Sequence, residues 1–481
     1  MELIIIFTAI FIAVIACSLS RRRGAIEFIS AAAALVAFIE SIFVALRVAA
    51  AGIYAPNQIF SVDALGAIIV FIISLVGLAA SFYSVFYLRE ETAKGIVGFK
   101  RVKQYFILLN LFFAAMFLAV VSSSPIIAWI SIEATTLSTA FLISFYNKPT
   151  SMEAAWKYLI INSVGLLLGF FGTLLYLTSL KIGGGADPAT WSLLLSNAAH
   201  FDPMIAKIAF VFVLVGYGTK IGLAPMHTWL PDAHSKAPVP ISALLSGVLL
   251  NVAFLALLRF KAITDIAVGA DFSGKLLIAF GLLSVFIAVF IIFGQRSYKR
   301  LLAYSSIENM GIMALGFGFG GLGVLAAIFH LLYHSLLKAG LFLSAGNIFL
   351  KYSSTKISKV KGALAALPIT GILFLLGFFA IVGTPPFGIF FTKIFIFSAG
   401  MPAYPIISMV AIFLTAILFV GFFKHVTAMM FGERPPEIKA GKENIWLILP
   451  PLALIVIVLC FSFYLPPFLQ KLITLAASGY K

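Results

Sequence analysis

Three titratable side chains stand four residues apart in one apolar stretch of the chain. They are His330, His334 and Lys338, in the segment HLLYHSLLKAGLFLSAG. In a helix each step of four residues turns the side chain by about 40°, so all three share one face and rise about 12 Å along it. Histidine takes up and releases protons near neutral pH, which makes this ladder a candidate proton relay. The alternative is a polar seam that holds neighbouring helices together by hydrogen bonds.

Two further lysines stand beside proline breaks in apolar segments. Lys220 precedes Pro225 in TKIGLAPMHTWLPD. Lys393 follows Pro385 and Pro386 in VGTPPFGIFFTK. Proline removes a backbone donor and clashes with the preceding turn, so both segments are expected to break at membrane depth. Paired broken helices are typical of transporters with inverted repeats and an ion path at the midplane. Two ordinary proline kinks are the alternative.

A carboxylate occupies the centre of another apolar segment. Glu133 lies in WISIEATTL, and its charge state depends on whether a lysine is near. Lys157, in AAWKYL, and Lys220 are the candidate partners. If such a pair forms, protonation of Glu133 would free the lysine to release its own proton, so that the pair acts as a switch. A structural ion pair is the alternative.

The composition places these residues in a membrane protein. Of the 481 residues, 62% are hydrophobic and 10% are charged, against about 25% charged in soluble proteins. Apolar runs of about 20 residues, the length that crosses the hydrocarbon core, recur along the whole chain. About fourteen spans are expected. They lie at 2–19, 25–50, 62–88, 102–121, 124–145, 151–180, 204–230, 238–261, 273–294, 299–319, 321–350, 365–398, 402–431 and 444–464.

Basic residues in the loops predict the orientation. Alternate loops carry twenty lysines and arginines on one side and seven on the other, Lys181 and Lys481 among the seven. Because basic residues of short loops stay on the cytoplasmic side, the richer side is predicted to be cytoplasmic and both termini outside. The net charge of +16 then reflects topology and contact with anionic lipid. A nucleic-acid partner is not needed to explain it.

Sites for redox or hydrolytic chemistry are missing from the sequence. Cys17 and Cys460 lie in the first and last expected spans, with no spacing that suits zinc or iron–sulfur ligation. A glycine-rich phosphate loop, a nucleophile elbow and a metalloprotease helix are also absent. We therefore expect no cofactor, no metal and no catalytic residue in this chain. The remaining charged residues inside spans are interpreted as structural pairs or subunit contacts, namely Asp63, Glu40 with Arg47, Glu308 and His425.

The segments WISIEATTL, AAWKYL and TKIGLAPMHTWLPDAHSKAP carry a family resemblance. The chain resembles the antiporter-like membrane subunits shared by respiratory complex I, membrane-bound NiFe hydrogenases and Mrp sodium/proton antiporters, and most of all hydrogenase-4 component F. The resemblance covers nearly the whole chain. It implies an all-α polytopic membrane protein in which helices four to eight and nine to thirteen form inverted repeats, with helices seven and twelve broken. The expected divisions are 1–101 for the N-terminal helices, 102–261 and 271–431 for the repeats, and 432–481 for the last helix and tail.

The same resemblance implies roles for the polar residues inside the spans. It makes Glu133 the glutamate of the fifth helix and Lys220 the lysine of the seventh, in the half-channel that takes up protons. Lys393 matches the lysine of the twelfth helix, in the output half. The central polar axis between them is matched by His330, His334 and Lys338.

Two loop residues and one amide complete the implied pathway. His227 and Asp232 match the loop after the broken helix, where the histidine helps to admit or orient protons. Asn251 stands where relatives of the complex I type carry a lysine or histidine on the eighth helix. Because an amide does not titrate, transfer between the halves must use water or pass directly from Lys220 to the histidines.

The resemblance also implies a function. We expect proton translocation in a membrane-bound NiFe hydrogenase, of the formate hydrogenlyase or ferredoxin-linked type, driven by electron transfer in a peripheral arm. Other membrane subunits and that arm would be the partners, with the NiFe and iron–sulfur centres in the arm, H+ or Na+ as the ion and the cell membrane as the location. The alternatives are an Mrp-type Na+/H+ antiporter subunit, a proton-pumping subunit of complex I, and a scaffold that keeps the fold but no longer conducts.

Overall fold

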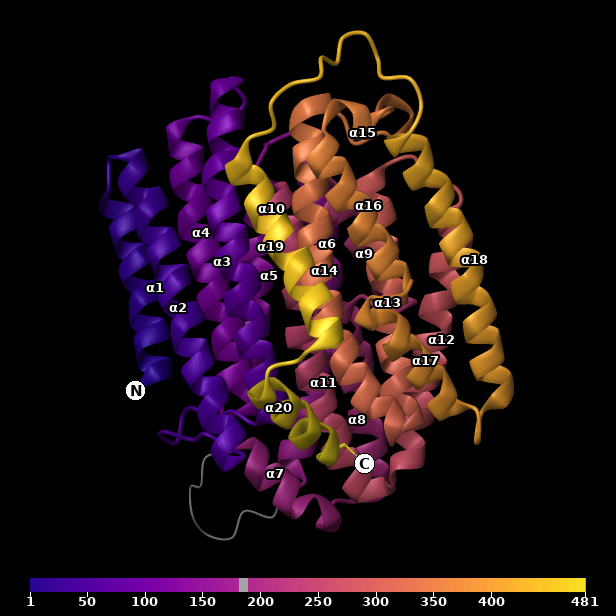
Figure 1. The fold of residues 1–481 in the computed structure, drawn as a ribbon. Coiled ribbons are helices and arrows are strands. Elements are labelled where there is room, and N and C mark those ends of the chain that lie inside the picture. The colour runs from indigo at the N-terminus through magenta and orange to yellow at the C-terminus, as the bar shows by residue number, and fades with distance from the viewer. Residues whose placement is uncertain (181–188, 481) are drawn as a thin grey trace.

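The computed structural model describes residues 1–180 and 189–480, and helices make up nearly all of these two ranges (Figure 1). Lys181 and Lys481 of the charge count lie outside the described residues. Within the described ranges, 12 helical segments are long and apolar enough to cross a membrane. The prediction of an all-α polytopic membrane protein is confirmed.

The first half of the chain follows the predicted spans within a few residues. Its helices are α1 (Glu2–Leu19), α2 (Arg23–Ala51), α3 (Ala64–Ala93), α4 (Phe99–Val121), α5 (Pro125–Ile143), α6 (Pro149–Thr178), α7 (Trp191–Asn197), α8 (Pro203–Ile221), α9 (Trp229–Lys236), α10 (Val239–Leu244) and α11 (Leu250–Val268). A π-helical turn at Leu245–Leu249 joins α10 to α11, so that Val239–Val268 forms one span.

The second half agrees with the predicted spans equally well. Its helices are α12 (Ala270–Ile292), α13 (Tyr298–Phe319), α14 (Leu322–Tyr352), α15 (Ala363–Ala366), α16 (Pro368–Val382), α17 (Gly388–Gly400), α18 (Pro405–Met430), α19 (Ile445–Phe463) and α20 (Pro467–Ser478). The 22 residues of α13 make it about 33 Å long, enough to cross although it carries many polar side chains. Together with the interrupted pair α16 and α17, α13 completes the expected set of crossings.

Two crossings are interrupted at the predicted prolines. After α8 the chain passes through Gly222, which has a φ of 80°, and a 3-10 turn at Met226–Thr228 before α9 begins. After α16 it passes through Gly383, with a φ of 88°, before α17 begins. Each helix ends at a residue in the left-handed backbone region. That residue is glycine because any side chain would be strained there. The broken seventh and twelfth spans are therefore observed, while the boundaries of the two repeats stay predictions.

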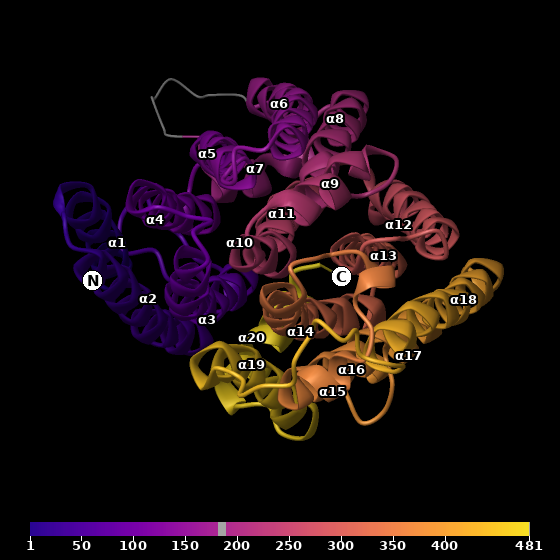
Figure 2. The ribbon, with the colours of Figure 1, turned by 90° about the horizontal axis from the view of Figure 1, so that it is seen from above.

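The interior of the bundle holds the helices that carry polar residues. Seen from above, α10, α11, α13 and α14 lie inside a ring formed by the other helices (Figure 2). The apolar window of Val239–Val268 is 100% buried, whereas that of α18 is 33% buried. Charged groups on the central helices consequently face protein and not lipid, as membrane-embedded charges require.

Two short helices at one end of the bundle were not predicted. α7 has seven residues and α20 has 12, and both lie at the end where the chain termini are found (Figure 1). α20 buries Leu469, Leu472, Ile473 and Ala476 and contacts α2, α3 and α14. The basic loops gather at the opposite end, as the charge pattern requires. Which end faces the cytoplasm stays a prediction.

Candidate functional site

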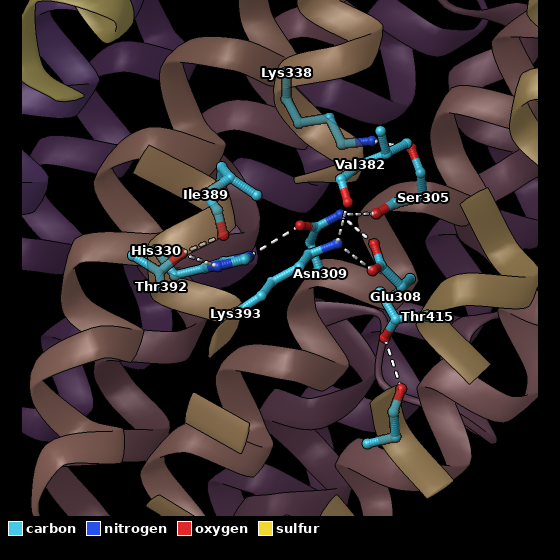
Figure 3. A network of polar contacts seen from close by, with 11 residues as sticks. Ser305, Glu308, Asn309, His330, Lys338, Val382, Ile389, Thr392, Lys393 and Thr415 are labelled. Atoms are coloured by element: carbon cyan, nitrogen blue, oxygen red, sulfur yellow. Dashed lines mark hydrogen bonds and ion pairs between the residues drawn. The ribbon is translucent and has the colours of Figure 1, made fainter. Parts of the chain in front are cut away.

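A buried ion pair joins the broken twelfth crossing to α13. The Nζ atom of Lys393, on α17, lies 2.8 Å from Oε1 of Glu308, and both side chains are buried (Figure 3). The same Nζ donates to the carbonyl of Val382 at 3.2 Å. Val382 is the last residue of α16, and the final carbonyls of a helix lack partners inside it. The helix break thus supplies an acceptor that fixes the lysine.

The lower histidine of the ladder belongs to the same network. His330 Nδ1 lies 2.9 Å from Oγ1 of Thr392, and Nε2 lies 2.9 Å from Oδ1 of Asn309. The amide nitrogen of Asn309 in turn donates to Glu308. A continuous set of polar contacts therefore connects α14, α13 and α17, from His330 through Asn309 and Glu308 to Lys393 (Figure 3).

The upper ladder residue contacts the beginning of α13. Lys338 Nζ donates to the carbonyl of Leu302 at 2.8 Å and to the hydroxyl of Ser305. His334 lies between the two ends, with its ring stacked near that of His330 at a centroid distance of 6.4 Å. Among the described residues neither nitrogen of His334 has a hydrogen-bond partner. All three side chains are buried, and two of them contact α13 as the common face predicts.

A hydroxyl group connects the carboxylate and the lysine of the first half. Lys220 Nζ donates to Thr136 Oγ1 at 2.8 Å, and that hydroxyl donates to Glu133 Oε2 at 3.3 Å. Tyr158 accepts a second bond from Lys220 at 2.7 Å, and Ser163 donates to Glu133 at 2.6 Å. Within the described part of the chain no direct ion pair joins Glu133 and Lys220. The predicted pair is therefore bridged by Thr136.

Asn251 lies between the two halves. Its amide nitrogen donates to Ser335 Oγ at 2.7 Å and to the carbonyl of Gly247 at 3.2 Å. Its Oδ1 is buried without a partner among the described residues. Ser335 is the neighbour of His334 on α14, and the π-helical turn just before α11 presents Asn251 to it. Turns of this type often occur at functional positions.

Comparison with known proteins decides the family. Residues 122–419 match the family described as "NADH:quinone oxidoreductase/Mrp antiporter, TM". A hydrogenase-4 component F homolog of Methylacidiphilum infernorum is 36% identical over 422 residues, which cover 86% of this chain and 87% of that protein. The chain belongs to the antiporter-like membrane subunits of the complex I, hydrogenase and Mrp superfamily. The predicted resemblance is confirmed.

Two solved structures share the fold of this antiporter-like subunit. A chain of the membrane-bound sulfane sulfur reductase, an archaeal respiratory membrane complex, superposes with a TM-score of 0.86 at 21% identity, covering 100% of this chain and 96% of that chain. A chain of the Mrp complex from Dietzia sp. DQ12-45-1b gives a TM-score of 0.86 at 20% identity, covering 100% and 97%. At these identities the two comparisons establish the fold alone.

Lys157 lies elsewhere in the antiporter-like subunit than the sequence suggested. It pairs with Glu153 at 2.5 Å and lies 3.7 Å from Asp232, and 49% of its side chain is exposed. Of the two candidate partners of Glu133, Lys157 is excluded, because it pairs with an acid four residues away on the exposed face of α6. Lys220 is the candidate that reaches Glu133, through Thr136. Asp232 also pairs with Arg300, so both residues belong to a surface ion network at the basic end.

His227 and the other charged pairs have separate surroundings. His227, in the turn after the break, is buried beside Tyr304, with 6.3 Å between ring centroids. Arg47 pairs with Glu2 at 2.7 Å and not with Glu40. Asp63 and His425 were interpreted as structural pairs or subunit contacts, and both make contacts within the chain. Asp63 pairs with Arg259 at 3.2 Å, and His425 lies 3.0 Å from the carbonyl of Ile292.

Sequence reasoning missed two residues of the site. Glu308 was interpreted as a structural contact, since a single carboxylate in an apolar run does not reveal its partner. His234, on α9, is buried, and its ring stacks on the ring of Phe342 with 4.9 Å between centroids. Phe342 lies one helical turn from Lys338 on α14. Neither of its nitrogens has a partner among the described residues. His234 therefore extends the row of buried titratable groups toward the basic end.

The described residues do not include a metal site. They contain no group of three or more His, Cys, Asp or Glu side chains placed to hold an ion. What the arrangement does offer is a series of proton donors and acceptors buried in protein, with a lysine near each helix break. The chemistry that this arrangement can perform is proton transfer.

Replacing Thr136 by valine is expected to slow proton transfer about tenfold or more, because the two hydrogen bonds that link Lys220 to Glu133 are lost at nearly constant volume. The rate would be measured as acidification of proteoliposomes that contain the assembled complex. Thr173→Val is the matched control, since Thr173 is also buried and donates only to the Gly169 carbonyl, at 2.8 Å. A wild-type rate in Thr136→Val would show that Glu133 does not act on Lys220 through this hydroxyl.

Proposed function

We propose that this antiporter-like subunit translocates protons for a membrane-bound NiFe hydrogenase of the formate hydrogenlyase or ferredoxin-linked type. Electron transfer in a peripheral arm, where the NiFe and iron–sulfur centres lie, drives the movement. The observation that carries the proposal is the series of buried titratable groups that runs from Lys220 through the histidines of α14 to Lys393. The identity with a hydrogenase-4 component F homolog supports the choice of partner complex.

Uptake is assigned to the first half. Protons enter from the basic, cytoplasmic end and reach Lys220, whose ammonium is stabilised by Glu133 through Thr136. A charge change in the neighbouring complex that neutralises Glu133 weakens this stabilisation and releases the proton. Moving one charge across 100 mV costs about 2.3 kcal/mol, which corresponds to about a 50-fold change in proton affinity. Such a change is within what a neighbouring charge produces.

Transfer between the halves is assigned to Asn251 and water. The buried Oδ1 of Asn251 and both nitrogens of His334 have no partner among the described residues, and buried polar atoms of this kind usually bind ordered water. A water held between them carries the proton across the position where relatives of the complex I type use a titratable residue. His330, Asn309 and Glu308 then lead to Lys393, from which the proton leaves at the end that bears the termini.

An Mrp-type Na+/H+ exchange function is the second candidate. The family that residues 122–419 match includes Mrp antiporters in its description, which favours it. It differs from the first proposal in requiring sodium and in running without an electron donor.

Purification of the native complex tests the proposal. We expect NiFe and iron–sulfur subunits to copurify in mild detergent, and we expect proton movement in proteoliposomes to require hydrogen formation or oxidation. Mass spectrometry identifies the partners, and a pH-sensitive dye reports the movement. Recovery of small hydrophobic partners alone, together with sodium-dependent exchange, would replace the hydrogenase assignment by the antiporter.

A further inference from the structure

A polar pocket opens at the basic end of the bundle, apart from the proton pathway. Its volume is about 350 Å³, within the range of about 300–1,000 Å³ that small-molecule sites occupy. Residues from α3, α6, α9, α10, α13 and α14 line it, together with the loops that precede α6 and follow α9 and α14. It is thus formed between helices of both halves, near the centre of this end.

Four lysines line this pocket and no acidic residue does. They are Lys148, Lys236, Lys299 and Lys356. None of these four lysines forms an ion pair with a described residue. The lysines that do form ion pairs are Lys157, Lys261, Lys275 and Lys393. Lys299 is buried at the floor and donates to the carbonyl of Ala237 at 2.6 Å. Lys148 and Lys356 are exposed at the rim. Cations brought together without ion-pair partners repel one another, so an anion would relieve the arrangement.

A buried carboxylate behind the wall, Glu91, interacts with Lys299 and offsets only part of these charges. Glu91 is buried and does not line the pocket. Its Oε1 accepts a bond from the Tyr146 hydroxyl at 2.6 Å, and the Tyr87 and Tyr146 side chains stand at the wall. The carboxylate therefore lies behind the tyrosines, while Lys148 and Lys356 are exposed to solvent.

Three long helical segments begin at the pocket. α6 contributes Thr150, the span Val239–Val268 contributes its first residue, and α13 contributes Lys299. The first amides of a helix lack internal partners and carry a partial positive charge, which favours anions. The hydroxyl group of Thr150 adds a donor at the same place, whereas those of Ser151 and Ser235 already donate to the carbonyls of Lys148 and Asp232.

We propose that this pocket binds a phosphate group, as free phosphate or as the headgroup of an anionic phospholipid. A phosphate group presents several acceptor oxygens, with one negative charge in a phospholipid diester and more as free phosphate, and so matches four lysines, the Thr150 hydroxyl and the helix N-termini at the pocket. Basic pockets between membrane helices on the cytoplasmic side are suited to such headgroups. This proposal does not depend on the proposed function, because no lysine of the proton pathway lines the pocket.

The full chain, purified in detergent, is the material for the test. Binding of 32P-labelled orthophosphate is measured by equilibrium dialysis, and retention of short-chain phosphatidylglycerol is measured by native mass spectrometry. The test variant is Lys236→Gln/Lys356→Gln. The matched control is Lys359→Gln/Lys361→Gln, which removes the same charge from the same end at exposed residues outside the lining. Thermal unfolding verifies that both variants are folded.

We expect the test variant to bind about tenfold more weakly or worse, and the control to bind as the wild type does. Loss of orthophosphate binding in the test variant alone identifies free phosphate as the ligand. Loss of the phosphatidylglycerol adduct alone identifies a lipid headgroup. The proposal is overturned if the wild type binds neither probe, or if test and control variants weaken binding equally. A misfolded test variant is replaced by Lys356→Gln against Lys359→Gln, judged by the same criteria.

Discussion

Proton translocation is expected to stop when Lys393 is replaced by alanine, and the chain is expected to lose about 3–5 kcal/mol of folding free energy. The reason lies in Glu308, which is 1% exposed and has the Lys393 ammonium 2.8 Å away. Alanine leaves that carboxylate buried without its cation, and among the described residues only the Asn309 amide still donates to it. The proton acceptor of the output half is removed by the same change.

A second variant separates the two effects. In Lys393→Met/Glu308→Gln both charges disappear and the glutamine carbonyl still accepts from Asn309, so stability should return to within about 1–2 kcal/mol of the wild type. Translocation should stay absent, because methionine does not titrate. Thermal unfolding and dye-reported proton movement in proteoliposomes measure the two quantities. Lys424→Ala, at an exposed position of α18, is the control.

The outcome of this cycle decides between a relay and a seam. If the double variant regained both stability and translocation, the ion pair would be a structural device and the α14 ladder a polar seam between helices. If it regained stability alone, Lys393 would be a carrier of the proton.

The two halves of the pathway hold their lysines in different ways. In each half a glutamate stabilises a lysine near a helix break, which supports the proposed inverted repeats. In the second half Lys393 touches Glu308 directly, whereas in the first half Thr136 stands between Lys220 and Glu133. A bridged contact is weaker and more easily changed by an outside charge. We therefore infer that an outside charge changes the proton affinity of Lys220, in the first half, more easily than that of Lys393, in the second.

The fold was predictable because each signal is local. About 20 apolar residues specify a span whatever its neighbours are, and Pro225 and Pro385 break their helices through their own backbone geometry. The amphipathic α20 was missed because its pattern of buried Leu469, Leu472 and Ile473 is short and follows a span that already accounted for the hydrophobicity.

The site was predictable only where one helix carries it. Spacing alone places His330 and Lys338 on the same face of α14, and both contact α13. Contacts between helices that are far apart in sequence cannot be predicted from residue spacing. Glu308 and Lys393 are 85 residues apart. Lys157 is a different case, because its partner Glu153 lies four residues away on the same helix and spacing could have indicated that pair. A carboxylate in an apolar run predicts a partner without naming it.

Replacing Asn251 by leucine is expected to reduce proton translocation at least tenfold while electron transfer in the complex continues. Leucine has a similar volume but removes the 2.7 Å bond to Ser335 and the free Oδ1 next to the α14 ladder, so water is no longer held between the halves. A tenfold reduction corresponds to about 1.4 kcal/mol, comparable to one lost hydrogen bond. Asn251→His should retain translocation, because a histidine carries the proton itself.

The control for this substitution is Asn110→Leu on α4. Asn110 is as deeply buried and donates to Ser30 at 2.9 Å and to the Phe106 carbonyl at 2.7 Å, but it lies away from the pathway. Equal losses in both leucine variants would mean that a buried amide matters only for packing. A wild-type rate in Asn251→Leu would mean that protons pass from Lys220 to the histidines by another route. Loss in Asn251→Leu alone, with recovery in Asn251→His, assigns the crossing between the halves to this residue.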